Sequence, residues 1–153
     1  MKHHALKTIV ALLGAAMLFT ACGKDNDSIV GEWQWTGTTV HHVNSYMGND
    51  TTYTVDYPTY KDLTFHENNK VDVMQMGASI PEYAPYYHIS RYNYRLNAAG
   101  DSIYLTDPQG VYYPQSWAIK SLTEKRLVLE YTEEAGDFAG TDVYTVTTTY
   151  RRR

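Results

Sequence analysis

Leu63-Thr64-Phe65-His66-Glu67-Asn68-Asn69-Lys70-Val71-Asp72-Val73 alternates apolar and polar side chains on both sides of a short polar turn. Residues two positions apart in a β-strand lie on the same face, so each arm of this stretch has one apolar face. Asparagine tolerates positive φ, which suits Asn68 and Asn69 to the turn of a hairpin. The stretch therefore predicts two antiparallel strands that share a buried face.

The same alternation recurs along the chain from residue 29 onward. Trp33 and Trp35 share a face of the first strand, and the last strand is rich in threonine and tyrosine, which favour a pleated surface. The pattern predicts strands over 29–43, 52–57, 60–66, 70–76, 88–96, 102–106, 116–121, 126–132 and 142–151. A loop or a short helical turn is predicted over 77–87, where Pro81 and Pro85 disfavour a strand. A loop is also predicted from Glu133 to Asp142, which is rich in glycine and acidic residues.

Eight or nine sequential strands in one domain must protect their edges. Closure into an up-and-down antiparallel barrel removes the edges, whereas a β-sandwich is the competing solution. We expect an all-β barrel over 29–153, with the sandwich as the alternative.

The amino-terminal segment has the zones of a secretory signal. Lys2 and Lys7 precede an apolar run from Ile9 to Phe19, which ends at Thr20-Ala21-Cys22. At about 1.5 Å per residue, this run is too short to cross a hydrocarbon core of about 30 Å as a helix. Residues 1–21 are therefore predicted to be a cleaved signal peptide.

Leu18-Phe19-Thr20-Ala21-Cys22 resembles a lipobox, which marks a cysteine for acylation after cleavage. Cys22 is the single cysteine of the chain, so it has no disulfide partner and is the predicted lipid attachment site. Several acyl chains of the palmitate type would hold the protein stably on its membrane. Residues 22–28 are polar and are expected to form a flexible tether.

The tether predicts an outer-membrane location. Gly23 replaces the aspartate that retains lipoproteins at the inner membrane of enterobacteria, and Lys24, Asp25 and Asp27 resemble a charged surface-export signal of Bacteroidota. We expect display at the cell surface rather than a periplasm-facing position. Removal of Lys2 and Lys7 with the signal leaves 11 basic and 17 acidic side chains, a net charge of −6, which argues against nucleic acid. A monomer is expected. Arg151-Arg152-Arg153 is interpreted as a frayed terminus or an edge guard.

The residues that usually identify an enzyme are missing from the sequence. There is no Gly-x-Ser-x-Gly elbow and no phosphate-binding glycine motif, and Cys22 is assigned to lipid. His41 and His42 are adjacent in a predicted strand, so they point to opposite faces and would not chelate one metal ion. The acidic residues near Glu133 are interpreted as a solvated loop. We therefore predict no catalytic residue, no metal site and no cofactor.

Ile29-Val30-Gly31-Glu32-Trp33 contains a Gly-x-Trp motif at the start of the domain. Together with 63–71 and with the pattern over 120–129, this motif resembles the lipocalin-like lipoproteins of Bacteroidota. The resemblance implies an eight-stranded barrel with a cavity at one end. It also implies that Gly31 permits close packing, that Trp33 plugs the closed end, and that Arg151 or Arg152 packs on Trp33.

The chain is unusually aromatic, with 15 tyrosines and three tryptophans. Such rings either form the core of a β domain or line a ligand cavity. Tyr92, Tyr94 and Trp117 are the candidate cavity residues. The predicted function is non-catalytic binding of a small apolar or glycan ligand in an aromatic-lined barrel. The alternative is an envelope interaction or inhibitor protein that acts through its outer surface.

Overall fold

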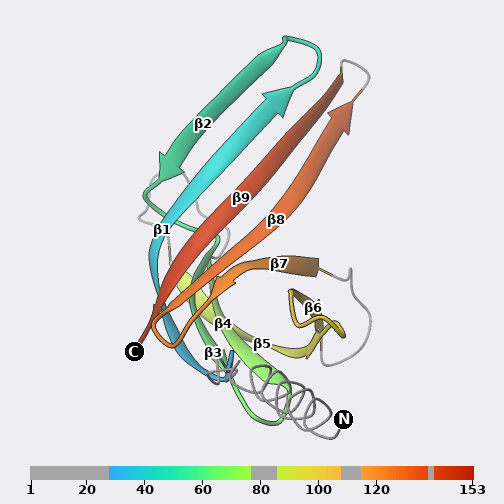
Figure 1. Cartoon of the computed structure of the whole chain (residues 1–153). Helices are drawn as coiled ribbons and strands as arrows, with labels where there is room; N and C mark the ends of the chain where they lie inside the picture. The colour runs from blue at the N-terminus through green and yellow to red at the C-terminus, as the bar shows by residue number, and fades with distance from the viewer. Residues whose placement is uncertain (1–27, 77–85, 108–114, 138–139) are drawn as a thin grey trace, which may run out of the picture.

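The computed structural model describes residues 28–76, 86–107, 115–137 and 140–153, which form one antiparallel sheet (Figure 1). Each strand overlaps one predicted range. The strands are β1 (Gly31–Asn44), β2 (Asn49–Val55), β3 (Tyr60–Phe65), β4 (Lys70–Met76), β5 (Tyr87–Leu96), β6 (Ser102–Thr106), β7 (Gln115–Leu122), β8 (Arg126–Asp137) and β9 (Gly140–Arg152). Within these described ranges, no helix is long and apolar enough to cross a bilayer.

Two loop predictions need correction. Glu133 to Asp142 was predicted to be a loop, but β8 continues to Asp137 and β9 begins at Gly140. Cross-strand pairs such as Glu134 with Val143 extend the ladder, whose backbone hydrogen bonds outweigh the low strand propensity of acidic residues and glycine. Tyr87 also belongs to a strand, as the first residue of β5, while 77–85 of that predicted loop lie outside the described residues.

The nine strands occupy eight positions around a closed barrel. β9 pairs with one edge of β1, and both β2 and β3 pair with the other edge. β2 and β3 are therefore two parts of one barrel position, interrupted by residues 56–59 opposite a bulge between Trp35 and Gly37. Because the β1–β9 pairing closes the ring, the predicted all-β up-and-down barrel is confirmed and the sandwich alternative is wrong.

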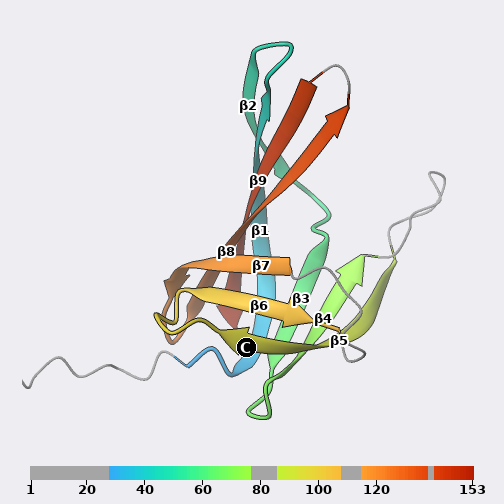
Figure 2. The ribbon, with the colours of Figure 1, turned by 90° about the vertical axis from the view of Figure 1, so that its right-hand side faces the viewer.

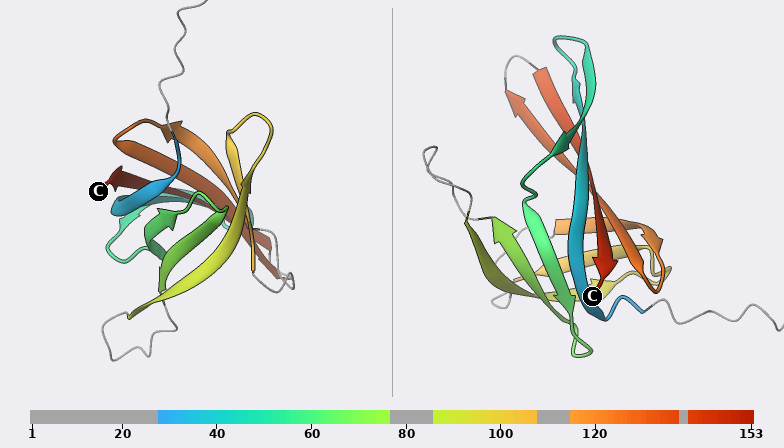
Figure 3. Two further views of the ribbon diagram at one scale, coloured as in Figure 1. Left: turned by 90° about the horizontal axis from the view of Figure 1, so that it is seen from below. Right: turned by 90° about the vertical axis from the view of Figure 1, so that its left-hand side faces the viewer.

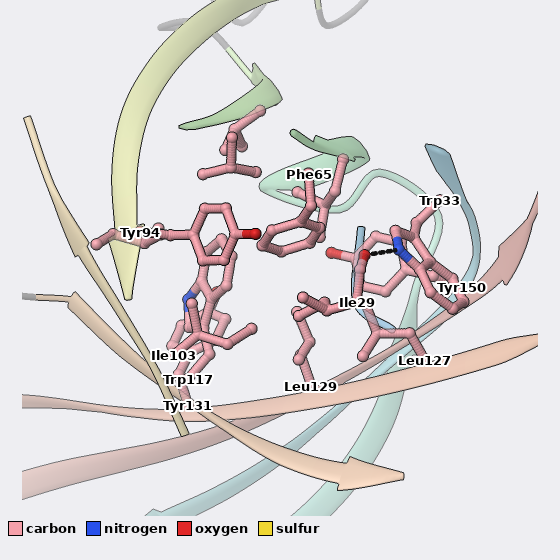
Figure 4. Close-up of a cluster of buried hydrophobic side chains, with 14 of the residues drawn as sticks. Ile29, Trp33, Phe65, Tyr94, Ile103, Trp117, Leu127, Leu129, Tyr131 and Tyr150 are labelled. Carbon is pink, nitrogen blue, oxygen red and sulfur yellow. Dashed lines mark hydrogen bonds between the residues drawn. The ribbon is translucent and has the colours of Figure 1, made fainter. Parts of the chain in front are cut away.

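One end of the barrel is closed by the Gly-x-Trp motif and the carboxyl terminus. Trp33 is 1% exposed, and its indole nitrogen donates to the Ile29 carbonyl oxygen at 2.8 Å (Figure 4). The Arg152 guanidinium lies 4.5 Å from the centre of the Trp33 ring and donates to the carbonyl oxygens of Val30 and Ser28. Of the two arginines that the resemblance allowed, Arg152 makes the contact.

Gly31 makes room for this arrangement. Its φ is +137°, and a Cβ at this position would lie 3.1 Å from Nη1 of Arg152. The interpretation of 151–153 as a frayed terminus or an edge guard is wrong on both counts. Arg151 has paired residues on both neighbouring strands, Gln34 of β1 and Arg126 of β8, so it does not lie at a free edge, and all three arginines contact residues at the start of the barrel. Arg151 donates to the Gln34 side-chain oxygen at 2.9 Å, and Arg153 donates to the Asp62 carboxylate at 2.9 Å.

The lower part of the barrel is filled with side chains. Phe65 and Tyr94 meet edge to face with ring centres 5.0 Å apart, and both are buried (Figure 4). The other fully buried large side chains come from most strands of the ring: Trp33, Leu63, Val71, Val73, Ile103, Trp117, Leu127 and Tyr150.

The opposite end carries a projecting sheet, which we call the flap. The flap consists of β2, residues 38–44 of β1, residues 132–137 of β8 and residues 140–146 of β9. These strands extend well beyond the rest of the barrel (Figures 1 and 2). The ring of strands is visible from below in the left panel of Figure 3, and the right panel shows the flap rising from one side of it. The inner face of the flap therefore stands over the open end of the barrel.

Candidate functional site

The three aromatic residues predicted from sequence to bind a ligand belong to the barrel wall and its core. Tyr94 is 8% exposed and Trp117 is 1% exposed, while Tyr92 is half-buried beside them and donates to the Gln75 side-chain oxygen at 3.0 Å. Figure 4 shows Tyr94 and Trp117 among the packed hydrophobic side chains. None of the three lines either of the two hollows described below.

A pocket lies where the inner face of the flap meets the open end of the barrel. Its volume is about 160 Å³, and we call it the tyrosine pocket. Five tyrosines, three threonines, three valines and one carboxylate line it: Tyr53, Tyr57, Tyr60, Tyr131, Tyr144, Thr38, Thr59, Thr148, Val40, Val55, Val146 and Glu133.

Strand alternation brings these side chains to one face. Val40 of β1 is paired with Tyr53 of β2 on one side and with Val146 of β9 on the other. Tyr144 of β9 is paired with Glu133 of β8, which adds a fourth strand to the same wall. Because paired residues point to the same side of a sheet, four strands contribute to a continuous tyrosine-rich surface.

Tyr60 and Tyr131 form the floor of the pocket. Their rings meet edge to face at 5.9 Å, and the Tyr60 ring lies 5.2 Å from that of Trp117 in the core below. Burial raises the pKa of Tyr131, and the nearby Glu133 carboxylate raises it further. The Tyr131 phenol therefore stays neutral across the physiological range and keeps its proton for donation.

Tyr144 packs against its cross-strand neighbour on the inner face of the flap. The His42 ring stacks on it with centres 4.4 Å apart and planes only 6° from parallel. His42 Nε2 and Asn44 Nδ2 lie 2.7 Å and 2.6 Å from the Asp142 carboxylate. The His42 contact lowers the pKa of Asp142, with a smaller effect from Asn44. This cluster joins β1 to β9 beside the Tyr144 ring.

His41 has a separate partner on the outer face. Its Nε2 lies 2.6 Å from the Asp50 carboxylate of β2, whereas His42 points inward, as adjacent strand residues should. The described residues contain no group of three or more histidine, cysteine, aspartate or glutamate side chains that could hold a metal ion.

A second hollow lies at the break between β2 and β3. Its volume is about 560 Å³, and it is wide open to solvent. The Trp35 indole nitrogen donates to the Thr38 hydroxyl at 2.9 Å at this break. Most of the other lining residues are threonines: Thr36, Thr39, Thr54, Thr147 and Thr149, together with Gly37, Val55 and Asp56. The hollow shares Thr38 and Val55 with the tyrosine pocket, so the wall between the two is thin.

Sequence reasoning missed the residues of the tyrosine pocket. Tyr53 and Val55 alternate, as do Tyr144 and Val146, so the apolar face of each strand was readable. Sequence alone did not indicate that these strands extend beyond the ring of the barrel. Because they do, their apolar face lies beside open space rather than in the core. Glu133 was assigned to a solvated loop, whereas it lies on β8 and lines the pocket.

Comparison with known proteins bears on the fold alone. No family model and no curated protein matches the chain. A complex of bovine odorant-binding protein with a selenium-containing odorant has 12% identity and a TM-score of 0.43, over 80% of this chain and 69% of that chain. A deswapped triple mutant of bovine odorant-binding protein gives the same values with 72% of its own chain covered. A redesigned β-barrel has 16% identity and a TM-score of 0.33, over 82% and 91% of the two chains.

Proposed function

We propose that this protein is a lipid-anchored, non-catalytic envelope protein that binds one ring of a glycan in the tyrosine pocket. The observation that carries the proposal is the lining of that pocket, in which five tyrosines stand among threonine hydroxyls and one carboxylate. Aromatic faces stack on the apolar faces of sugar rings, and hydroxyls and carboxylates hydrogen-bond to sugar hydroxyls.

The size of the pocket favours a glycan over a long apolar ligand. A cavity of about 150 Å³ accommodates benzene, so a pocket of about 160 Å³ has room for one face of a sugar ring but not for a long acyl chain. Pockets that bury most of a drug-sized ligand are larger, at about 300–1,000 Å³. A terminal sugar with the rest of its chain in solvent fits these dimensions. Glu133 is the one carboxylate among the described lining residues, and glycoside hydrolysis ordinarily uses a pair.

The position of the tether agrees with a binding role in the envelope. The described chain starts at Ser28, whose carbonyl oxygen accepts a hydrogen bond from Arg152 at the closed end of the barrel. The flap lies at the other end (Figure 2), and flap residues such as Tyr53 and Tyr144 line the tyrosine pocket. An anchor at Cys22, on the outer membrane and at the cell surface, would therefore leave the pocket facing away from the membrane.

A panel of immobilised bacterial and host glycans tests the proposal. The full chain, purified in detergent, should bind a subset of the panel. Tyr53→Ala and Tyr144→Ala should each weaken binding about fivefold, since one lost aromatic stacking contact costs about 1 kcal/mol. The control is Tyr104→Ala. Tyr104 is on β6, where its ring contacts the Arg95 guanidinium, and it does not line the pocket. Absence of binding across the panel, or equal losses for Tyr104→Ala, would contradict the proposal.

A further inference from the structure

The flap has two outer edges, and they differ in chemistry. β2 pairs with β1, and residues 132–137 of β8 pair with β9; no second partner strand appears for either segment among the described residues. The β8 edge carries exposed Glu133 and Glu134. The middle of the β2 edge reads Thr51-Thr52-Tyr53-Thr54, with no charge and no proline, and the one charged residue of the strand is Asp50 near its start.

This difference matters because an unpaired strand edge is a template for another strand. Proteins usually protect such edges with charged residues, proline, bulges or a covering segment. The acidic side chains of β8 provide this protection, whereas the centre of β2 consists of residues that favour strands. The β2 edge is therefore competent to accept an added strand.

Exposed apolar side chains gather around the same edge. Tyr46 and Met47, in the turn that precedes β2, are 74% and 70% exposed. Tyr53 within β2 is 46% exposed, and Tyr57, just after it, is 61% exposed. The other large apolar residues exposed in the described chain lie on or beside β5: Tyr86, Ile89 and Leu96. A concentration of such side chains along one unprotected edge is typical of a protein-interaction surface.

We propose that the β2 edge binds an extended segment of another protein, which joins the flap as an additional antiparallel or parallel strand. The main-chain groups of β2 would supply the hydrogen bonds, and alternate side chains of the segment would contact Tyr53 and its exposed neighbours. Asp50, whose carboxylate also contacts His41 Nε2 at 2.6 Å, lies near the start of this edge, and Asp56 directly follows its end. The segment is therefore uncharged and alternately apolar in its middle and basic at its ends.

A second copy of this chain fits the edge less well than a partner protein does. Two copies of β2 related by a two-fold axis pair antiparallel, so their barrels point in opposite directions. The closed end, where Ser28 enters, would then face opposite ways in the two copies (Figure 2). Two chains anchored through Cys22 in one membrane could not pair in this way. This step rests on the proposed anchoring; the choice of the β2 edge does not.

A labelled synthetic peptide that alternates valine with threonine and carries lysine at both ends is the probe. Fluorescence anisotropy with the full chain in detergent should show saturable binding. The double variant Thr52→Lys/Thr54→Lys should weaken this binding about tenfold or more, because charges on an edge oppose strand addition. The control is Thr132→Lys, an exposed threonine on β8 at the opposite edge, which should bind like the wild type.

Three outcomes would overturn the proposal. The first is that the peptide does not bind, and the second is that the β2 double variant and Thr132→Lys bind the peptide equally well. The third is that native mass spectrometry finds a dimer of this chain that the β2 double variant dissociates. Glycan binding is measured on the same double variant and should be unchanged, because Thr54 lines the outer hollow while Tyr53 faces the tyrosine pocket. Failure of the glycan proposal is thus distinguishable from failure of this one. Far-ultraviolet circular dichroism confirms that each variant is folded.

Discussion

Single tyrosines of this chain have different roles according to their depth in the barrel. Tyr94 packs edge to face on Phe65, and its hydroxyl donates to the His66 carbonyl oxygen at 3.2 Å. Tyr53 and Tyr144 instead stand over open space in the flap. A substitution at Tyr94 should therefore change stability, whereas substitutions at the other two should change binding.

Replacement of Tyr94 by alanine should lower the free energy of unfolding by about 3–5 kcal/mol, the usual cost of removing a large aromatic side chain from a core. Tyr94→Phe should lower it by only about 1 kcal/mol, since it loses one hydrogen bond and keeps the ring. Urea denaturation followed by tryptophan fluorescence measures both. A Tyr94→Ala variant with wild-type stability and impaired glycan binding would return Tyr94 to the ligand site.

Arg152 is the residue that joins the carboxyl terminus to the start of the barrel. Lysine at this position cannot stack its charge on Trp33 while it donates to both Val30 and Ser28, so Arg152→Lys should cost about 1–3 kcal/mol. The matched change Arg151→Lys alters an exposed contact with Gln34 and should cost about 0.5 kcal/mol or less. Thermal denaturation of the Arg152→Lys and Arg151→Lys variants measures this difference. Equal melting temperatures would show that the contact of Arg152 with Trp33 is not stabilising.

At the scale of elements, one carboxylate joins three neighbouring strands. Asp72 of β4 accepts from Arg91 of β5 at 2.5 Å and 2.8 Å, and it lies 3.0 Å from Nε2 of His66, which follows β3. The Arg91 hydrogen bonds are the main reason that the pKa of Asp72 falls from 3.8 to about 2. The ionised form is therefore the one that the folded barrel favours.

A depressed pKa in the folded state implies stability that is present above the unfolded pKa and is lost below it. Asp72→Asn should therefore destabilise the barrel at pH 7 by about 1 kcal/mol, a modest figure because solvent screens the pair. The difference between variant and wild type should shrink as the pH falls from about 4 to about 2. Urea midpoints at pH 7, 4 and 2.5 measure this trend, and a difference independent of pH would exclude the ionic explanation.

At the scale of the whole molecule, the barrel has a direction. Trp33, Arg152 and the entry of the chain at Ser28 occupy one end, and the flap with the tyrosine pocket occupies the other. An anchored barrel with this arrangement would present its pocket and its β2 edge to the surroundings. The proposed function and the further inference both depend on this end being accessible.

Lipid anchoring is tested at Cys22, which lies outside the described residues. Cys22→Ser should abolish metabolic labelling with a fatty-acid analogue, because serine offers no thiol for acylation, and unprocessed precursor should accumulate. Detergent extraction and immunoblotting of membrane fractions follow the precursor. Protease treatment of intact cells then distinguishes display at the cell surface from a periplasm-facing position. Labelling that persists in the variant would place the lipid on another residue and contradict attachment at Cys22.

The local sequence pattern was sufficient to locate each strand of this protein, although not the full length of every strand. Alternation and turn chemistry identified every strand position, and the hairpin after Phe65 turns at Asn69, which has a φ of +60° as expected for asparagine. Pattern failed at the far end of β8, since Glu133 and Glu134 have low strand propensity and are held in the ladder only by pairing with β9. Propensity is a local quantity, whereas pairing depends on a neighbour from elsewhere in the chain.

The sequence by itself determined the all-β class, the succession of strands along the chain and the apolar face of each strand, because these follow from patterns among residues close along the chain. The pairing of β1 with β9, which closes a barrel rather than a sandwich, joins distant residues and was decided by the tertiary structure. Only the tertiary structure decided that β2 and β3 share one barrel position and that the flap extends beyond the ring of strands. For the same reason, Tyr94 and Trp117 became core while Tyr53 and Tyr144 became pocket. An aromatic residue in a strand predicts an apolar face, and the strands opposite that face determine whether it is packed or open.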